Sequence, residues 1–186
     1  MKAALLAPLL LLLASGAHAA DAPQAASAKP LATIASLDLK RYMGTWYEIA
    51  KFSNRFQKKC VGFTTATYSV RGDGRVDVLN RCSLKDGNTD VASGIARQVG
   101  GPASPKLKVR FAPAILSFLP MAWGDYWVID LDADYQLAAV SEPKREYLWI
   151  LSRTPTVDPA AYDALLGRLR AQGLDTGRLV PTRQVP

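Results

Sequence analysis

The stretch Arg41-Tyr42-Met43-Gly44-Thr45-Trp46-Tyr47-Glu48-Ile49 is the part of the sequence that decides the fold. Glycine can adopt backbone conformations that other residues avoid, and the aromatic residues after Gly44 favour a β-strand. Alone, the pattern Gly-x-Trp-Tyr predicts only a strand that begins at a glycine and carries two aromatic side chains. Its meaning depends on the strands, the helix and the arginine that the rest of the chain supplies.

Short segments of alternating polar and apolar residues follow this stretch and are separated by turn residues. The segment from Arg71 to Arg75 contains two glycines and is typical of a tight hairpin turn. Eight short strands at regular spacing indicate an all-β sandwich or an up-and-down barrel. We expect them at about residues 45–52, 63–71, 75–82, 90–98, 106–112, 125–131, 136–141 and 146–152.

One helix is predicted after the eighth strand. Asp158 is a favourable N-cap, Pro159 suits the first helical position, and Gly173 ends the pattern. Since the helix follows all eight strands, it must pack on the outside of the sheet. A short additional strand is expected at about residues 178–180. One apolar stripe would face the sheet, formed by Tyr162, Leu165, Leu166 and Leu169.

The N-terminus has the features of a secretory signal peptide over residues 1–19. Lys2 precedes a short apolar run, and Ala17-His18-Ala19 provides a small-residue cleavage site. A buried N-terminal helix is the alternative. Residues 20–36, rich in Ala, Pro and Ser, predict a flexible arm, and residues 37–186 predict one domain. We therefore expect an exported, periplasmic protein, and without a cysteine near Ala19 we expect no lipid anchor.

The rarest residue types exclude several classes of function. His18 is the only histidine and lies in the predicted signal peptide, so Ser-His-Asp, Cys-His and histidine-metal sites are excluded from the mature protein. The only cysteines, Cys60 and Cys82, flank the predicted hairpin and should form a disulfide in an oxidising compartment, although two free thiols are the alternative. The net charge is +7, but the basic residues are scattered, which argues against nucleic acid as a partner.

With eight strands and an outer helix, the chain resembles a lipocalin, specifically the bacterial lipocalins related to apolipoprotein D, over about residues 37–180. Three motifs carry the resemblance: Gly44-Thr45-Trp46-Tyr47, the turn Asp130–Tyr135 with Asp132, and Arg153 after the last strand. The turn departs from the usual Thr-Asp-Tyr of the family. The resemblance implies an eight-stranded barrel in which Trp46 packs under Arg153 at the closed end, so Gly44, Trp46, Asp132 and Arg153 are structural.

The resemblance also implies a cup for an apolar ligand. Because side chains alternate along a strand, Tyr147 and Trp149 should face inward while Leu148 and Ile150 lie under the helix. Small residues on the predicted first, second and fourth strands favour a hollow interior over a filled one, namely Ala50, Ala66, Ala92, Gly94 and Ala96. The expected ligand-binding residues are Ala66, Tyr68, Val78, Val109, Phe111, Tyr126, Val128, Tyr147 and Trp149.

The apolar segment from Phe111 to Trp123 joins the fifth and sixth predicted strands. With its prolines it should form neither strand nor helix. It is expected to be a lid over the cup or a lip that touches membranes, and burial against the arm or in a dimer is the alternative. The residues expected to meet a head group or form the rim are Arg55, Lys58, Lys59, Phe118 and Leu119.

The sequence therefore predicts a carrier of fatty acids or lysophospholipids in the bacterial envelope, without a cofactor, that acts as a monomer or weak homodimer and makes peripheral contact with anionic membranes. One alternative is an enzyme that acts on a bound lipid through carboxylates and tyrosines, for example Glu48. Another is a membrane-surface protein without a ligand. Asp130, Asp132 and Asp134 are read as an acidic turn and not as a calcium loop, because the glycine and glutamate of such a loop are missing, and no metal site is expected.

Overall fold

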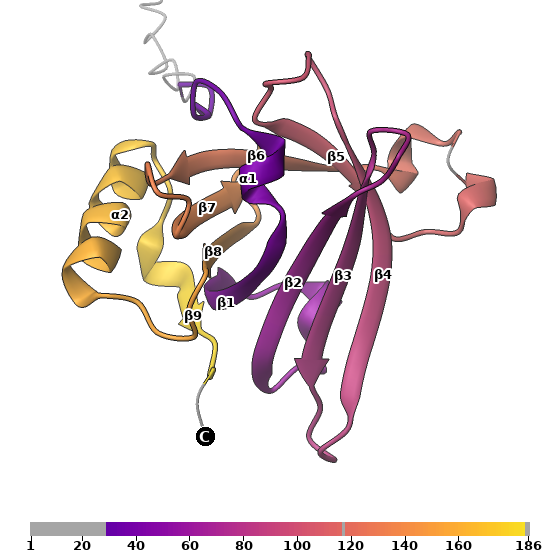
Figure 1. Cartoon of the computed structure of the whole chain (residues 1–186). Coiled ribbons are helices and arrows are strands. Elements are labelled where there is room, and N and C mark those ends of the chain that lie inside the picture. The colour runs from indigo at the N-terminus through magenta and orange to yellow at the C-terminus, as the bar shows by residue number, and fades with distance from the viewer. Residues whose placement is uncertain (1–28, 117, 185–186) are drawn as a thin grey trace, which may run out of the picture.

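The computed structural model describes residues 29–116 and 118–184. Nine strands form one antiparallel sheet in the order β2-β3-β4-β5-β6-β7-β8-β1-β9, and a further pairing of β2 with β1 closes it into a barrel (Figure 1). The predicted eight-stranded up-and-down barrel with an additional C-terminal strand is confirmed. The strands are β1 Gly44–Phe52, β2 Gly62–Val70, β3 Val76–Ser83, β4 Thr89–Gln98, β5 Lys106–Arg110, β6 Gly124–Leu131, β7 Leu137–Ser141, β8 Leu148–Ser152 and β9 Leu179–Pro181.

The main helix, α2 (Pro159–Ala171), lies outside the barrel beside β7 and β8 (Figure 1). Its buried Leu165 and Leu169 pack in one cluster with Leu148 and Ile150 of β8, which confirms the predicted outer helix and the outward face of that strand. The remaining helical segments are short. They are α1 Leu39–Tyr42 and the 3₁₀ turns η1 Arg55–Gln57, η2 Ala114–Leu116, η3 Pro120–Ala122 and η4 Thr176–Arg178.

The barrel wall separates two hydrophobic cores. The inner core contains Trp46, Val128 and Val140, and the outer core lies between the wall and α2. Every residue of β7 is buried, because one face of this strand points into the barrel and the other lies in the outer core. This double burial explains why β7 reads as a continuous apolar run and not as an alternating one.

The closed end of the barrel is held by Arg153. Its guanidinium carbon lies 3.9 Å from the centroid of the Trp46 ring, which is fully buried. The guanidinium also donates hydrogen bonds to three backbone carbonyls, those of Arg41 (2.8 Å), Thr45 (3.0 Å) and Tyr135 (3.2 Å). Arg153 therefore ties the end of β8 to α1, β1 and the turn between β6 and β7.

Gly44 is needed where this closed end begins. Its φ is +94°, a conformation that side-chain-bearing residues rarely adopt, and an added Cβ would lie 3.3 Å from Nη1 of Arg153. In the β6–β7 turn, Asp132 accepts hydrogen bonds from the backbone amides of Gln136 and Leu137, both at 2.7 Å. Both residues thus shape backbone at the closed end.

The expected disulfide is present between Cys60 and Cys82, with the two Cα atoms 5.6 Å apart. Cys60 lies near the end of the connection from β1 to β2, and Cys82 is near the end of β3. The bridge therefore fastens the β1–β2 connection to the wall at the open end of the barrel. Constraining the unfolded chain over this loop stabilises the fold by roughly 3 kcal/mol in chain-entropy models.

Two predicted strands are shorter by two residues in the structure. The fifth ends at Arg110 and not at residue 112, just before Pro113, which cannot donate a backbone hydrogen bond to a sheet. The eighth begins at Leu148 and not at residue 146, because the Glu142 carboxylate accepts hydrogen bonds from backbone amides of residues 144, 146 and 147 and holds them in a turn.

The predicted signal peptide and most of the predicted arm lie outside the described residues. The described part of the arm is packed against the barrel. Leu31 is buried in the outer core, and the Ile34 amide donates to the Val128 carbonyl at 3.2 Å. The composition predicts flexibility here. It does not show that the side chains of Leu31 and Ile34 pack against the barrel.

We predict that Arg153→Ala lowers the free energy of unfolding by about 2–4 kcal/mol, because it removes a cation–π contact and three hydrogen bonds. Urea denaturation followed by circular dichroism measures the change. The matched control is Arg178→Ala, since exposed Arg178 lies 4.3 Å above the Phe52 ring and its loss should cost under about 1 kcal/mol. Equal losses in the two variants would contradict the role given to Arg153.

Candidate functional site

A cavity of about 880 Å³ occupies the interior of the barrel. Its walls come from β1 to β6 and β8, and its mouth lies among the connections that join β1 to β2, β5 to β6 and β7 to β8. Apolar side chains line the lower part, among them Val76, Val78, Ala96, Leu107, Val109 and Leu151. The barrel is therefore a hollow cup, as the small residues of β4 suggested.

Eight of the nine predicted ligand-binding residues line this cavity: Ala66, Tyr68, Val78, Val109, Phe111, Tyr126, Tyr147 and Trp149. The ninth, Val128, does point inward, but it is fully buried in the inner core and does not reach the cavity. Phe111 lies against the backbone of β4, where a Cβ on Gly94 would come within 2.8 Å of the Phe111 ring. The missing side chain of Gly94 thus provides the space for Phe111.

An aromatic group forms the wall near the mouth. The rings of Tyr147 and Trp149 stack with centroids 5.7 Å apart, and Phe56 of η1 lies 5.6 Å from Tyr147. The Trp149 indole N–H donates to Gln57 Oε1 at 3.0 Å. Because the indole N–H is paired in this way, the stacked rings present apolar surface to the cavity.

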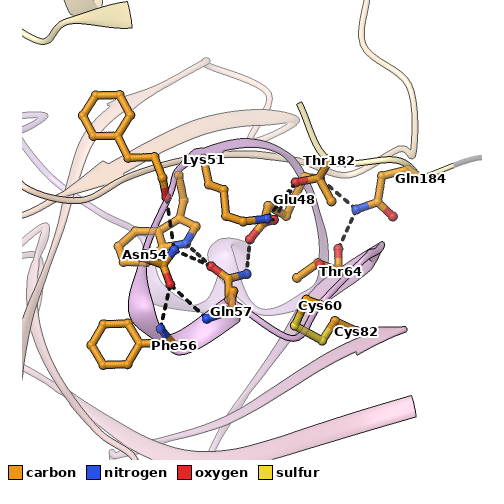
Figure 2. Close-up of polar contacts among 12 residues, drawn as sticks. Glu48, Lys51, Asn54, Phe56, Gln57, Cys60, Thr64, Cys82, Thr182 and Gln184 are labelled. Atoms are coloured by element: carbon orange, nitrogen blue, oxygen red, sulfur yellow. Dashed lines mark hydrogen bonds and ion pairs between the residues drawn. A yellow bond between two sulfur atoms is a disulfide. The ribbon is translucent and has the colours of Figure 1, made fainter. Parts of the chain in front are cut away.

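A polar network surrounds the buried carboxylate of Glu48 on the cup wall, as Figure 2 shows. Its Oε1 accepts hydrogen bonds from Lys51 Nζ and Thr182 Oγ1, both at 2.6 Å, and its Oε2 accepts one from Gln57 Nε2. Asn54 caps η1 and donates to Gln57 Oε1 at 2.8 Å. A buried charge needs such partners, and here an ion pair and two neutral donors provide them.

The C-terminal segment closes a gap in this wall. The ladder between β1 and β2 ends at Tyr47 and Thr65, and beyond it β1 pairs with β9 instead. The amide of Phe63 then donates to the Arg183 carbonyl at 2.6 Å. The Gln184 side-chain amide bridges the carbonyls of Glu48 and Thr64, both at 2.7 Å (Figure 2).

Two buried polar atoms of cavity-lining residues have no hydrogen-bond partner among the described residues. They are Thr64 Oγ1 on β2 and Asn80 Oδ1 on β3, and both residues line the cavity. Both oxygens are covered by surrounding protein atoms, and a buried polar group without a partner is costly.

The floor of the cup is formed by three tyrosines, Tyr42 of α1, Tyr68 of β2 and Tyr126 of β6. The Tyr126 hydroxyl lies 2.8 Å from that of Tyr42 and 3.0 Å from that of Tyr68. Burial raises the pKa of Tyr42 and Tyr126 well above the ordinary value and that of Tyr68 to about 12. All three hydroxyls are therefore neutral at physiological pH.

The predicted rim residues are divided in the structure. Arg55 and Lys59 line the mouth, and Lys59 forms an ion pair with Asp90 at 2.7 Å. Lys58 instead faces a separate shallow hollow beside the β3–β4 turn. Phe118 is 75% exposed and Leu119 is half-buried, and neither lines the cavity.

The apolar segment between β5 and β6 stands out from the barrel (Figure 1). It contains the 3₁₀ turns η2 and η3, which corrects the expectation of no helical structure. These single turns cannot bury the apolar side chains, since Ile115 is 78% and Met121 89% exposed. The segment lies at the mouth, where Met121 and Trp123 also line the cavity, and it is called the lip below.

Sequence reasoning missed several residues of the cup. Thr64 shares its parity with Ala66 and Asn80 with Val78, so the period-two pattern would have found these two had polar residues been considered. Two others gave no such signal. Gln57 lies in a connection, and Tyr42 belongs to a four-residue helix that is too short for periodicity to reveal.

Two acidic side chains at the turn between β6 and β7 are bound by contacts within the protein. Asp130 forms a bidentate ion pair with Arg168 of α2 at 2.7 and 2.9 Å, and Asp132 holds the turn itself. Among residues 29–116 and 118–184, no group of three or more His, Cys, Asp or Glu side chains is arranged to hold a metal ion. Within the same residues, no helix is long and apolar enough to cross a membrane.

A family model described as a lipocalin-like domain matches residues 37–184. Temperature-induced lipocalin-1 of Arabidopsis thaliana is 40% identical over 158 residues, which cover 84% of each chain. Outer membrane lipoprotein Blc of Escherichia coli (strain K12) is 41% identical over 150 residues, or 80% of each chain. Apolipoprotein D of Mus musculus is 30% identical over 156 residues, covering 80% of this chain and 78% of that protein.

Solved structures share the fold at low sequence identity. Lobster apocrustacyanin A1 has a TM-score of 0.60 with 18% identity and covers 80% of this chain and 81% of its own. Insecticyanin of Manduca sexta has a TM-score of 0.61 with 17% identity, over 83% of this chain and 82% of its own. The family match spans the whole barrel with α2 and β9, and from this match and the relatives at 40–41% identity we conclude that the chain belongs to the lipocalin family.

Proposed function

We propose that this protein binds a single-chain amphiphile, a fatty acid or lysophospholipid, and carries or stores it in the bacterial cell envelope for membrane maintenance. The observation that carries the proposal is the cavity of about 880 Å³ inside a closed barrel. This volume is within the range of small-molecule sites, and its apolar lower walls suit an acyl chain. The family resemblance supports the same reading, because lipocalins are cups for small apolar ligands.

The energetics of the proposal are consistent with useful affinity. Burying about 12 methylenes of an acyl chain gains roughly 10 kcal/mol before costs. Lost translational and rotational freedom offsets several kcal/mol of this gain. A dissociation constant in the micromolar range or somewhat lower follows.

In the proposed complex the acyl chain lies along Trp149 and Tyr147, and the head group stays at the mouth near Arg55 and Lys59. Because Lys59 already pairs with Asp90, Arg55 carries most of the attraction for an acidic head group. A monomer provides the whole cup, so neither ligand loading nor release requires the weak homodimer that we also considered.

The proposed location is the periplasm, with peripheral contact to the outer membrane. Two observations support an envelope role: the N-terminal sequence reads as a signal peptide, and several relatives are named outer membrane lipoprotein. The exposed apolar lip at the mouth provides the proposed membrane contact.

A catalytic role is less well supported by the geometry. Glu48 is the carboxylate on the cup wall that such a role would use, but both of its oxygens already accept hydrogen bonds from Lys51, Thr182 and Gln57. Three of the four lone-pair sites of this carboxylate are thus occupied, and only one, on Oε2, is left to accept a proton from a substrate. The arrangement around Glu48 supports the wall of a binding cup.

We predict that hexadecanoate binds with a stoichiometry near one per chain and that Trp149→Ala weakens binding by about 1–3 kcal/mol, because a buried aromatic contact is lost. Isothermal titration calorimetry measures both quantities. Trp127→Ala is the matched control, since Trp127 packs in the outer core. If the two variants bind hexadecanoate equally well, Trp149 does not contact the chain and the proposed position of the ligand is wrong.

The second prediction concerns the lip. Replacing Ile115 and Phe118 with serine should slow transfer of a fluorescent fatty acid from anionic vesicles by about fivefold or more, since roughly 1 kcal/mol or more of membrane anchoring is lost. Affinity for a soluble probe should change much less than the transfer rate. Leu119→Ser should add little, because Leu119 is already half-buried.

The control for this experiment is Val70→Ser. Val70 is an exposed apolar residue, 46% accessible, at the end of β2 beside the closed-end hairpin. Stopped-flow transfer at low and high salt separates the apolar contribution of the lip from that of Arg55, because only the latter weakens with ionic strength. Transfer that is equally fast in wild type and in the Ile115/Phe118 variant would rule out membrane contact through the lip.

A further inference from the structure

The floor of the cup is more polar than an acyl chain requires. The three tyrosine hydroxyls of Tyr42, Tyr68 and Tyr126 meet where the terminal methyl group of a fatty acid would end. The surroundings are otherwise apolar, with Leu39, Met43, Val76, Ala96, Leu107 and Leu151 lining the same end of the cavity. This contrast indicates that the hydroxyls are a site in themselves.

Counting hydrogens shows what the group still offers. Three hydroxyls supply three O–H donors, but they make only two contacts with one another, Tyr42 with Tyr126 and Tyr68 with Tyr126. Whichever way these hydroxyls rotate, each contact uses one O–H and one donor is left over. The rings of Tyr42 and Tyr68 are stacked with their centroids 5.8 Å apart, and their hydroxyls form no hydrogen bond with each other.

Placing this spare tyrosine O–H against the terminal methyl group of an acyl chain is unfavourable. A buried hydroxyl that finds no acceptor loses the hydrogen bond that it made to water in the unfolded chain. Tyr42 and Tyr68 are 2% and 7% exposed, whereas Tyr126 is less buried and lines the cup, so the spare donor reaches a ligand when both neighbours donate to Tyr126 and its own O–H is left over. An oxygen atom at the deep end of a ligand would accept this hydrogen bond.

The chemistry of the floor selects a neutral acceptor. Burial raises the pKa of each tyrosine, so the group donates as a neutral hydroxyl. Arg153 lies close by, but its guanidinium already donates to the carbonyls of Arg41, Thr45 and Tyr135 and covers Trp46. An ionised carboxylate placed here would lose its hydration without gaining a free cation, whereas a hydroxyl or carbonyl oxygen would lose little.

We propose that the tyrosine floor is a subsite for a neutral oxygen, so that the preferred ligand is an apolar molecule with a hydroxyl or carbonyl group at its deep end. This inference rests on the proposed function, since it concerns a ligand held in the same cup. It changes the class of ligand, from a plain acyl chain to one that is oxygenated at the end remote from its head group.

The test compares two probes that differ only at the deep end, hexadecanoate and 16-hydroxyhexadecanoate, by titration calorimetry. In an apolar floor the added hydroxyl would weaken binding at least tenfold, because it would be buried without a partner. On the wild-type protein we expect the hydroxylated probe to bind at least as tightly as hexadecanoate. A wild-type protein that binds it tenfold more weakly would overturn the proposal without any variant.

The variant that removes the donor is the triple Tyr42→Phe, Tyr68→Phe, Tyr126→Phe, since any single substitution leaves a free O–H. Replacing all partners of a polar group by apolar rings of the same shape is tolerated far better than removing one of them. The ratio of the two dissociation constants should shift against the hydroxylated probe by about tenfold or more. Tyr162→Phe, on the face of α2 that packs in the outer core outside the cup, should leave this ratio unchanged.

The outcomes separate the two proposals. If neither probe binds the wild-type protein, the proposed function itself fails. If hexadecanoate binds but the ratio is the same in wild type and triple variant, the cup is a ligand site and the oxygen subsite is wrong.

Discussion

The guanidinium of Arg153 is the contact on which the rest of the structure depends. It joins α1, β1 and the β6–β7 turn through three carbonyls and covers the ring of Trp46. With the closed end fixed in this way, the upper barrel does not have to be filled by side chains in order to be stable. The cavity is therefore a consequence of where the stabilising contacts are concentrated, in the floor and in the outer core under α2.

Above this floor the polarity of the cup wall changes from the base to the mouth. Tyrosine hydroxyls form its base, apolar side chains its lower wall, and the Glu48 network with Thr64 and Asn80 a polar band on one side. The mouth adds Arg55 and an exposed apolar lip. A ligand that matches all levels is a long apolar molecule with oxygen functions, which is a narrower class than apolar ligands in general.

Much of this was predictable, for definite physical reasons. Period-two alternation predicted the strands of a sandwich or barrel, and the cap at Asp158 predicted the outer helix, because each is a local rule that the tertiary fold obeys. The choice of a barrel came from the resemblance carried by Gly44–Tyr47 and Arg153. Eight lining residues followed from parity. Val128 was wrongly expected to line the cavity, because alternation along a strand predicts which way a side chain points but not whether it reaches the cavity. The positions of Tyr42 in the floor, of Gln57 beside Trp149 and of Gln184 between β1 and β2 depend on contacts between distant segments. No local sequence pattern encodes such contacts.

The central claim is that the cup holds an amphiphile, and native mass spectrometry of protein exported to the periplasm and purified without detergent tests it most directly. The account predicts a species with one co-bound molecule per chain, of lipid mass, that is released when the protein is denatured. A spectrum that contains only the bare chain, and that stays unchanged after incubation with excess hexadecanoate and 16-hydroxyhexadecanoate, would contradict it.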